Sequence, residues 1–400
     1  MLKKLLFLGG SYFQVPAIRR AKELGYYVIT ADYLPSNPGH RYSDEYHNIS
    51  TTDREGILNL AKELKVNGVI AYASDPAAPV AAFVATELNL PTPPLESVLI
   101  LGIKDKWNKF LKDNNFNVPK FISGGNFEDF RFDEMTFPLI IKPVDSSGSK
   151  GVTLIQKEED FPVAFEYAQR FSGSKRIIAE EFVEMTGFMI GGDGFYGKDK
   201  VEFVRYGDVY ANENNPLVPS GFSIPTRLSA EIQSAITKEI ERALGLLIVR
   251  NLSFNLEVML DAEGKIYLKE MGPRNGGYFV PQLTAYESGV SLVDLALKSA
   301  MEPDFKAEIQ ERNREKNDSF YGFFVIHSDK KGIFEGVTYS FDEKIKILEE
   351  HIFVSKGDTV YPFSGSNHAM GVVICEFENL DILNDFYNQI EKYFEVNLSS

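Results

Sequence analysis

The motif that decides the fold is Ile140-Ile141-Lys142-Pro143-Val144-Asp145-Ser146-Ser147-Gly148-Ser149-Lys150-Gly151-Val152. Lys142 lies at the end of a predicted strand, which Pro143 terminates, so its ammonium can reach the phosphates of a nucleotide. Residues 146–151, here named the Ser/Gly loop, leave backbone N–H groups uncovered and can fold over a triphosphate, with Lys150 adding a second positive charge. The motif is not a Walker A loop, because the G-x-x-x-x-G-K-[ST] order is missing and a strand follows. A β-hairpin with a flexible turn is the alternative interpretation.

A second feature is a pair of glutamates on a predicted hairpin over residues 254–271, which turns at 261–264. If the first and last residues of that turn pair, Glu257 lies opposite Leu268, and Glu270 lies two residues further along the same face. Adjacent carboxylates repel unless a cation lies between them, and Mg²⁺ binds carboxylate and phosphate oxygens together. The pair therefore predicts an ATP–metal site. Two exposed hairpin glutamates are the alternative.

An arginine follows this hairpin directly. Arg274 beside a γ-phosphate and acyl oxygens would stabilise the charge that develops in phosphoryl transfer, and is the predicted catalytic residue. A surface arginine is the alternative.

Together these motifs resemble the ATP-grasp superfamily, in the branch with biotin carboxylase, the purine-pathway carboxylase and ligase enzymes and the L-amino acid ligases. In that family a lysine–proline pair with a Ser/Gly loop covers the ATP phosphates. The resemblance covers roughly residues 5–300 and implies an ATP-grasp core of two lobes. It also implies which residues bind ATP: Lys106 (within Lys104-Asp105-Lys106), Lys142, Ser146, Ser147, Gly148, Ser149, Lys150, Gly151, and the hinge strand Glu180, Glu181, Phe182 and Val183.

The resemblance further implies that Glu257 and Glu270 bind the metal, Mg²⁺ or Mn²⁺, and that residues 219–225 lie on the substrate side. The sequence departs from the family at two points. Gly272 stands where the family usually has a metal-binding asparagine, so water, Asn255 or Asn275 must replace that ligand. Residues 184–193 lack the family's usual carboxylate at the ribose contact.

The first hundred residues alternate predicted strands and helices. Such a βαβαβα pattern implies a doubly wound parallel sheet. The strands are expected at 5–8, 26–31 and 68–72, and the helices at 15–24, 52–64 and 79–88.

The turn Gly9-Gly10-Ser11 follows the first strand and opens a helix, so its backbone N–H groups can face an anion. Asp32 after the second strand suggests a dinucleotide site, but Gln14 and Val15 stand where further glycines belong. A tight structural turn, a substrate contact and NAD binding all stay open. The predicted substrate-binding residues are Gly10, Ser11, Asp75 and Asn275.

Three domains are expected, with an overall mixture of α/β and α+β structure. They are an N-terminal α/β domain (1–102), an ATP-grasp domain (103–310, with lobes of about 103–200 and 201–310) and a C-terminal α+β domain (311–400). Residues 305–318 are polar and predict a linker or exposed helix. Further elements are expected as strands at 137–155 (around the loop), 176–183, 320–327, 336–339, 345–354 and 369–377, and as helices at 230–246, 291–301 and 380–394.

Composition excludes several classes of function. The net charge of −15 argues against general binding to nucleic acids or anionic membranes. No stretch reaches the roughly 18 apolar residues of a membrane span. The single cysteine, Cys375, is expected in a buried strand, and excludes intrachain disulfides and favours the cytosol. No histidine pair has metal spacing, although His368 lies in a Ser/Gly-rich turn of the kind that often faces a cleft.

Residues and resemblance together predict an ATP-dependent carboxylate–amine ligase that works through an acyl phosphate and releases ADP and phosphate. Its partners would be small-molecule carboxylates and nucleophiles, such as amino acids, and a homodimer stays open. Three alternatives remain: a carboxylase of the biotin-carboxylase kind that uses bicarbonate, a nicotinamide-dependent oxidoreductase, and a non-catalytic nucleotide-binding protein.

Overall fold

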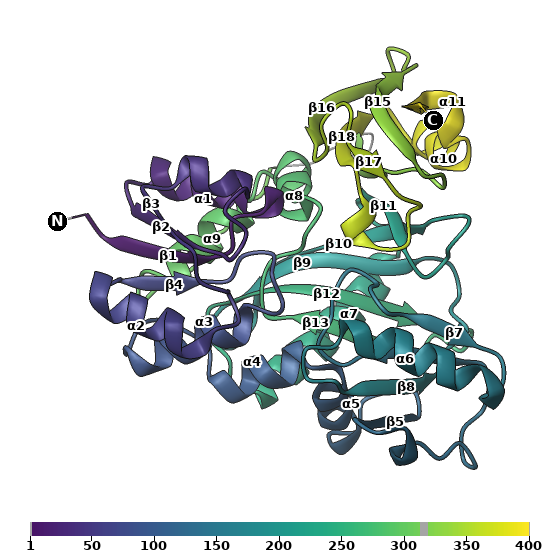
Figure 1. The fold of residues 1–400 in the computed structure, drawn as a ribbon, viewed down its shortest axis with the longest axis horizontal. Coiled ribbons are helices and arrows are strands. Elements are labelled where there is room, and N and C mark those ends of the chain that lie inside the picture. The colour runs from purple at the N-terminus through teal and green to yellow at the C-terminus, as the bar shows by residue number, and fades with distance from the viewer. Residues whose placement is uncertain (1, 313–318, 400) are drawn as a thin grey trace.

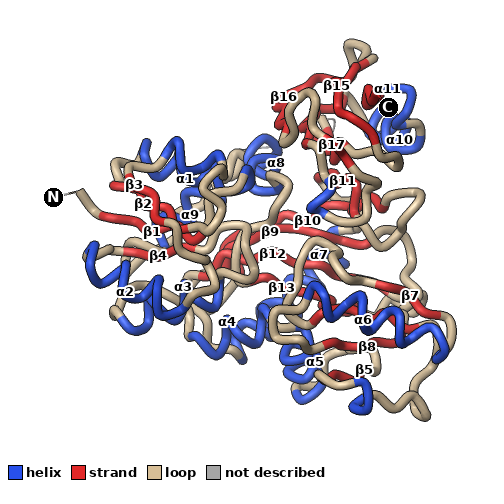
Figure 2. The backbone as a smooth tube through the Cα atoms, viewed as in Figure 1, coloured by secondary structure: helices blue, strands red, loops and turns tan. Residues whose placement is uncertain are grey.

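The structure is a computed structural model that describes residues 2–312 and 319–399. Three lobes surround a central region: the N-terminal lobe, the lobe of β5 to β8, and a group of C-terminal strands (Figure 1). Helices cover the sheets from outside, as the blue and red segments of Figure 2 show. No described helix has both the length and the apolar character needed to cross a membrane.

The N-terminal lobe contains a four-stranded parallel sheet in the order β3-β2-β1-β4. This confirms the predicted doubly wound α/β arrangement. The third strand in the chain, β3, was not predicted, because it is only three residues long and half-buried. The elements are β1 (Lys4–Leu8), α1 (Val15–Glu23), β2 (Tyr27–Ala31), β3 (Glu45–His47), α2 (Arg54–Leu64), β4 (Gly68–Ile70), α3 (Ala78–Glu87) and α4 (Leu95–Gly102).

The next lobe is a four-stranded sheet in the order β5-β8-β6-β7, entered through α5 (Lys104–Asp113). Apolar residues, including Phe130, Phe161 and Phe165, form its core against α6. The strand–loop–strand over the Ser/Gly loop and the strand at 176–183 are confirmed. The elements are β5 (Phe121–Gly124), β6 (Leu139–Pro143), β7 (Thr153–Ile155), α6 (Phe161–Phe171) and β8 (Ile177–Glu181).

The centre of the molecule is an eight-stranded antiparallel sheet in the order β13-β12-β9-β10-β11-β14-β18-β16. The helix α7 packs on it through Ile236, Ile240 and Leu244. Predicted helix 230–246 and the hairpin strands are confirmed. The elements are β9 (Met189–Tyr196), β10 (Val201–Ala211), β11 (Pro219–Ile224), α7 (Ala230–Leu246), β12 (Leu252–Leu260), β13 (Ile266–Gly272), β14 (Phe320–Ile326), β16 (Ile345–Ile352) and β18 (Gly371–Phe377).

This sheet crosses the predicted domain boundary at 310, because β11 pairs with β14. The C-terminal strands therefore extend the central sheet, and a smaller sheet in the order β17-β15-β19 lies beside them. The predicted helix 380–394 is found as two helices that are interrupted at Gln389. The chain then forms a last strand from Phe394 that pairs with β15. The elements are β15 (Gly332–Tyr339), β17 (Thr359–Val360), α10 (Leu380–Asn388), α11 (Ile390–Tyr393) and β19 (Phe394–Ser399).

Two helices after the hairpin, α8 (Val280–Ser288) and α9 (Leu292–Ser299), lead back to the N-terminal lobe. Val293 and Leu297 of α9 pack against Leu5 and Phe7 of β1 in one apolar cluster. The α9 helix thus completes the N-terminal core, although the sequence predicts it in the ATP-grasp domain. Of the predicted polar linker, residues 305–312 form neither helix nor strand, and 313–318 lie outside the described residues.

Candidate functional site

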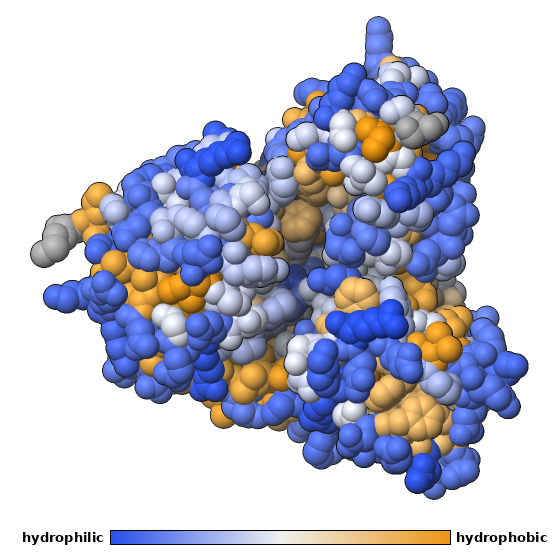
Figure 3. All heavy atoms as spheres, viewed as in Figure 1, coloured by the Kyte–Doolittle hydropathy of each residue, from blue (hydrophilic) through white to orange (hydrophobic). Residues whose placement is uncertain are grey.

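A cavity of about 670 Å³ lies where the lobes meet. Residues from the Ser/Gly loop, from the hinge after β8 and from the β12–β13 hairpin line it. A hollow between the three lobes is visible on the face drawn in Figure 3. Its volume is in the range of small-molecule sites.

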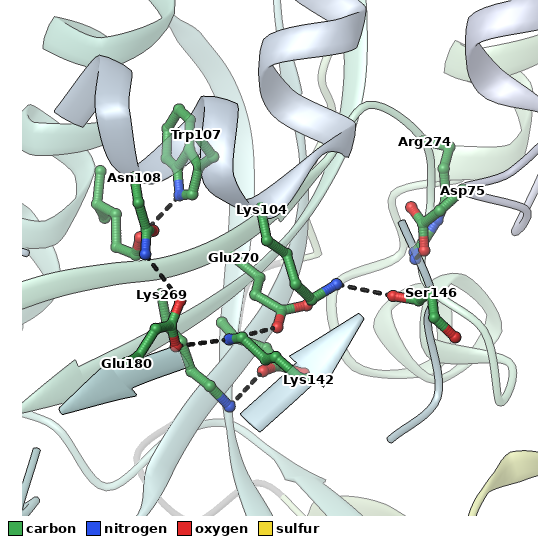
Figure 4. Close-up of polar contacts among 12 residues, drawn as sticks. Asp75, Lys104, Trp107, Asn108, Lys142, Ser146, Glu180, Lys269, Glu270 and Arg274 are labelled. Carbon is green, nitrogen blue, oxygen red and sulfur yellow. Dashed lines mark hydrogen bonds and ion pairs between the residues drawn. The ribbon is translucent and has the colours of Figure 1, made fainter. Parts of the chain in front are cut away.

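Lysines and glutamates converge at the inner end of this cavity (Figure 4). The Lys142 side chain is only 4% exposed, and its Nζ lies 2.8 Å from Glu180 Oε2 and 3.4 Å from Glu270 Oε1. Lys104 Nζ lies 3.4 Å from Glu270 Oε2 and donates a hydrogen bond of 2.7 Å to the Ser146 carbonyl. The sequence thus brings together groups separated by up to 166 residues (104 to 270).

Secondary structure explains how the two lysines meet one carboxylate. Lys142 is on β6, an inner strand of its sheet, and Lys104 is the first residue of α5. Trp107 anchors α5 to β13, because its indole Nε1 donates a hydrogen bond of 2.9 Å to the Leu268 carbonyl. Asn108, one residue further on, donates a bond of 2.7 Å to Glu180.

Electrostatics keep this cluster charged. Burial opposes ionisation of Glu270, but Lys104, Lys142 and Lys269 outweigh it and lower the pKa of Glu270 to about 2. Burial likewise opposes the charge of Lys142, whereas Glu180 and Glu270 raise its pKa above the usual value. Three lysines thus face three carboxylates (Glu180, Glu257 and Glu270), so the cluster alone is close to neutral.

The predicted register of the hairpin is wrong by two residues at Glu257: Leu260 pairs with Ile266, one residue beyond the assumed turn pairing, and a bulge adds the second. Val258 pairs with Leu268, and the next pair is Glu257 with Glu270, so Lys269 is the extra residue. The two glutamates are therefore directly opposite each other instead of offset, and share one face of the sheet. The bulged Lys269 places its Nζ 3.0 Å from Glu257 Oε2.

Lys106, the predicted nucleotide lysine of α5, does not line the cavity. Its side chain is 41% exposed, and its Nζ lies 3.5 Å from Glu96. Residues two apart on a helix point in nearly opposite directions. The Lys104 side chain therefore points to the cavity, and the Lys106 side chain points away from it. The lysine of this motif that lines the cavity is therefore Lys104, two residues before the predicted one.

The hinge residues lie at the cavity, but in different ways. Glu180, Glu181, Phe182 and Val183 all line it. The carboxylate of Glu180 is committed to Lys142 and Asn108, and that of Glu181 accepts a bond of 2.8 Å from the Thr136 N–H. These two carboxylates are therefore already paired, and a hydrogen bond from Glu180 or Glu181 to a ligand would come from their backbone.

The glycine turn of the N-terminal lobe does not reach the cavity. Gly10 N–H donates to Asp32 Oδ2 at 3.1 Å, and Ser11 N–H donates to Gln14 Oε1 at 2.6 Å. These internal bonds already occupy the Gly10 and Ser11 N–H groups, which favours the structural turn, and a substrate contact at these two residues stays a prediction. Phe13, just after the turn, lines the cavity instead.

Arg274 and Asp75 form a partly buried ion pair, and Arg274 lines the cavity. Among the described residues the buried Nε of Arg274 has no hydrogen-bond partner. Asn275 is 1% exposed and, with Arg274, lines a second cavity of about 390 Å³ on the N-terminal side.

Asp193, which the sequence analysis did not single out as a site residue, fixes the turn after Arg274. It is fully buried, and its carboxylate accepts bonds from Gly276 N–H at 2.7 Å and from Asn255 Nδ2 at 2.8 Å. Burial raises the pKa of Asp193 to about 6. No pattern in the sequence distinguishes this aspartate, because the pairing of β9 with β12 is needed to bring it beside Asn255.

The Ser/Gly loop has few anchors. Lys104 binds the Ser146 carbonyl, and Ser366 N–H donates a bond of 3.2 Å to the Gly148 carbonyl. Gly148 has φ +68°, and a Cβ there would meet Ser366. Residues 146–150 line the cavity, whereas Gly151 packs towards Pro143 and Phe171. His368 itself bonds to Ser364 at 2.9 Å, and Ser366 is the residue of that turn at the cavity.

We expect ATP to slow hydrogen exchange in residues 146–151, because bound phosphates would engage backbone N–H groups that now have few partners. The measurement is amide exchange by mass spectrometry with and without ATP and Mg²⁺. Residues 261–264, a turn outside the cavity, serve as the internal control. Equal exchange of the loop in both states would contradict its role as a phosphate cover.

Comparison of the amino-acid sequence with known proteins shows which proteins this chain resembles. Residues 135–282 match the model of the ATP-grasp domain. Formate-dependent phosphoribosylglycinamide formyltransferase of Prochlorococcus marinus is 30% identical over 189 residues, which are 45% of this chain and 48% of that protein. The chain thus matches about half the length of such curated relatives.

Solved structures extend the similarity to the whole fold. An L-amino acid ligase from Bacillus licheniformis aligns with a TM-score of 0.81 at 21% identity, covering 100% of this chain and 99% of that one. The biotin carboxylase domain of 2-oxoglutarate carboxylase from Hydrogenobacter thermophilus, in complex with MgADP and bicarbonate, aligns at 0.74 with 17% identity, covering 100% and 92%. Residues 135–282 therefore resemble an ATP-grasp domain, and the chain has the overall fold shared by the amino acid ligase and the biotin carboxylase domain.

Proposed function

We propose that this protein is an ATP-dependent carboxylate–amine ligase that works through an acyl phosphate. The observation that supports it most is the convergence of Lys104 and Lys142 on Glu270, beside the Ser/Gly loop, in one cavity. Buried ion pairs are weak evidence for stability, so a cluster of charges that opens to a cavity favours a functional role.

Each group has a role in this proposal. Lys104 and Lys142 bind the phosphates of ATP, and the Ser/Gly loop covers them through its N–H groups. A carboxylate oxygen attacks the γ-phosphorus, and ADP leaves. Arg274 stabilises the charge on the acyl and phosphoryl oxygens. An amine then attacks the acyl carbon, phosphate leaves, and the amine loses a proton as the amide forms.

The chemistry of Glu257 and Glu270 fits a divalent cation. Their carboxylates lie directly opposite each other, and the pKa of Glu270 is low enough to keep it ionised. In the described part of the chain no group of three or more His, Cys, Asp or Glu forms a metal site. Two carboxylates suit Mg²⁺ or Mn²⁺, which keep other positions for phosphate oxygens and water. The ion would supply positive charge that a near-neutral lysine–glutamate cluster lacks.

The experiment that tests the proposal is ADP release with pairs of amino acids and small carboxylates. Hydroxylamine is added in parallel, because it captures an acyl phosphate as a hydroxamate whatever the natural amine is. ADP release and hydroxamate formation that depend on a carboxylate would support the ligase. Release that needs bicarbonate and biotin would select the carboxylase, and ATP binding without turnover would select the non-catalytic protein. Light scattering of the same sample tests whether the protein forms a homodimer.

A matched pair of lysines tests the nucleotide site. Lys104→Ala removes a charge-assisted contact worth about 1.5–3 kcal/mol, so the KM for ATP should rise roughly tenfold to a hundredfold. Lys106→Ala on the same helix removes an exposed lysine outside the cavity and should stay within about twofold of the wild type. The measurement is ADP release against ATP concentration. If Lys106→Ala has the larger effect, the assignment of Lys104 is wrong.

A further inference from the structure

The cavity continues beyond Arg274 into a part lined by apolar side chains. We name this part the aromatic recess, and its defining residues are Phe13, Val209, Leu217, Phe222, Tyr278 and Phe323. The rings form a connected series. Phe13 and Tyr278 have centroids 5.2 Å apart, Tyr278 and Phe323 are 5.8 Å apart, and Phe222 and Phe323 are also 5.8 Å apart.

The backbone at this recess adopts an uncommon conformation. Tyr278 has φ 48° and Phe279 has φ 62°, two successive non-glycine residues in the left-handed region. Such residues cluster at ligand sites, because the rest of the structure must hold them there. Here Asp193 holds the turn by accepting a hydrogen bond from Gly276 N–H. Phe279 is buried, and its ring stacks on that of His351 with centroids 3.9 Å apart. Tyr278 lines the cavity.

Charge distinguishes the two ends of the cavity. All described Lys, Arg, Asp and Glu residues that line it belong to the lysine–glutamate cluster, the Ser/Gly loop, the hinge or Arg274. The six residues that define the recess carry no charge, and the cavity lining also includes the uncharged polar side chains of Asn214, Asn215 and Ser366. A phosphate needs arginine, lysine or several N–H donors, and burying one against aromatic rings without them is costly.

We propose that the aromatic recess binds the apolar body of the carboxylate substrate, a carboxylic acid with a large aliphatic or aromatic group such as phenylalanine or leucine. The inference rests on the proposed ligase function. Tyr278 of the recess follows Arg274 by four residues, so an acid whose carboxylate lies at Arg274 extends its body over Gly277 and Tyr278. The recess also disfavours a phosphate-bearing substrate such as the phosphoribosylglycinamide named for the curated relatives.

Gly277 offers a direct test. A Cβ built on Gly277 meets no heavy atom within 4 Å, so Gly277→Leu would extend into open space beside the recess without a clash. Gly102 meets the same criterion at the end of α4, outside both cavities, so Gly102→Leu is the matched control. Circular dichroism confirms that both variants fold.

The readout is hydroxamate formation from alanine, valine, leucine and phenylalanine with saturating ATP and Mg²⁺. In the wild type, KM should fall as the side chain grows, because each added methylene gains apolar contact. Gly277→Leu should raise the ratio of the KM for phenylalanine to that for alanine on the order of tenfold or more, and Gly102→Leu should leave the ratio unchanged. Formate with phosphoribosylglycinamide is tested in the same assay by ADP release.

The outcomes separate the inference from the function on which it rests. Two results would overturn substrate binding in the recess while the proposed ligase function stands. One is ADP release that is fastest with formate and phosphoribosylglycinamide, and the other is KM values that do not depend on side-chain size. Absence of ADP release with every carboxylate would overturn the proposed ligase. In that case, thermal shift in the presence of a non-hydrolysable ATP analogue tests whether the recess binds an apolar acid. Stabilisation by phenylalanine that Gly277→Leu removes would support binding in the recess. Absence of stabilisation by phenylalanine would overturn it.

Discussion

Replacing Glu270 with Gln is expected to lower turnover on the order of a thousandfold while the fold stays intact. The carboxylate is the shared partner of Lys104 and Lys142, and faces Glu257 across the hairpin. Both lysines keep a second partner in the variant: Lys142 keeps Glu180, and Lys104 keeps the Ser146 carbonyl. The amide preserves shape and removes the charge that would bind a divalent cation.

Glu257→Gln should have a similar effect, since the two carboxylates lie directly opposite each other. Glu263→Gln, on the exposed turn of the same hairpin, is the control and should leave turnover unchanged. The measurement is ADP release as a function of Mg²⁺ concentration, with circular dichroism to check folding. If Glu257→Gln and Glu270→Gln both retain the wild-type rate and Mg²⁺ dependence, the metal site lies elsewhere.

Lys142→Ala is expected to lower ATP affinity roughly tenfold to a hundredfold, because a charge-assisted phosphate contact is lost. The structure adds a second consequence. Lys142 is buried against Glu180, so its removal leaves a buried carboxylate without a cation and should lower the free energy of unfolding by about 3–5 kcal/mol. Urea unfolding measures the stability, and calorimetry measures ATP binding.

A second substitution separates the two effects of Lys142. Lys142→Ala combined with Glu180→Gln removes both charges, so much of the stability should return. ATP affinity should stay low, because the phosphate contact is still missing. Wild-type ATP affinity in the folded double variant would show that Lys142 has no direct part in binding.

The sequence predicted those parts of the fold where side-chain pattern is regular. The βα repeats of the N-terminal lobe and the 17-residue helix α7 have clear periodicity, and both are found. Strands β9 to β11 were not predicted, because glycines interrupt their pattern. A Cβ at Gly192 would lie 2.2 Å from the Arg205 carbonyl oxygen, so close strand pairing requires glycine where propensity argues against a strand.

The site was predictable in its motifs and not in its details. Lys142 and the two glutamates stand in recognisable local patterns. Lys104 and Lys106, in contrast, differ only in the direction in which their side chains project from the helix. The bulge at Lys269 leaves no mark in the residues around it, although it changes the pairing of Glu257. Asp193 and the recess depend on contacts between distant strands, which no single segment encodes.

The packing of α9 against β1 has a consequence for synthesis of the chain. The face of the N-terminal sheet that carries Leu5 and Phe7 is covered by Val293 and Leu297. A nascent chain that has left the ribosome only as far as α4 therefore exposes to solvent the part of this face that α1 does not cover. It stays exposed while nearly two hundred further residues are added (102 to 293). The N-terminal lobe is thus completed only after α9 has been synthesised, and chaperone contact during that interval would protect it.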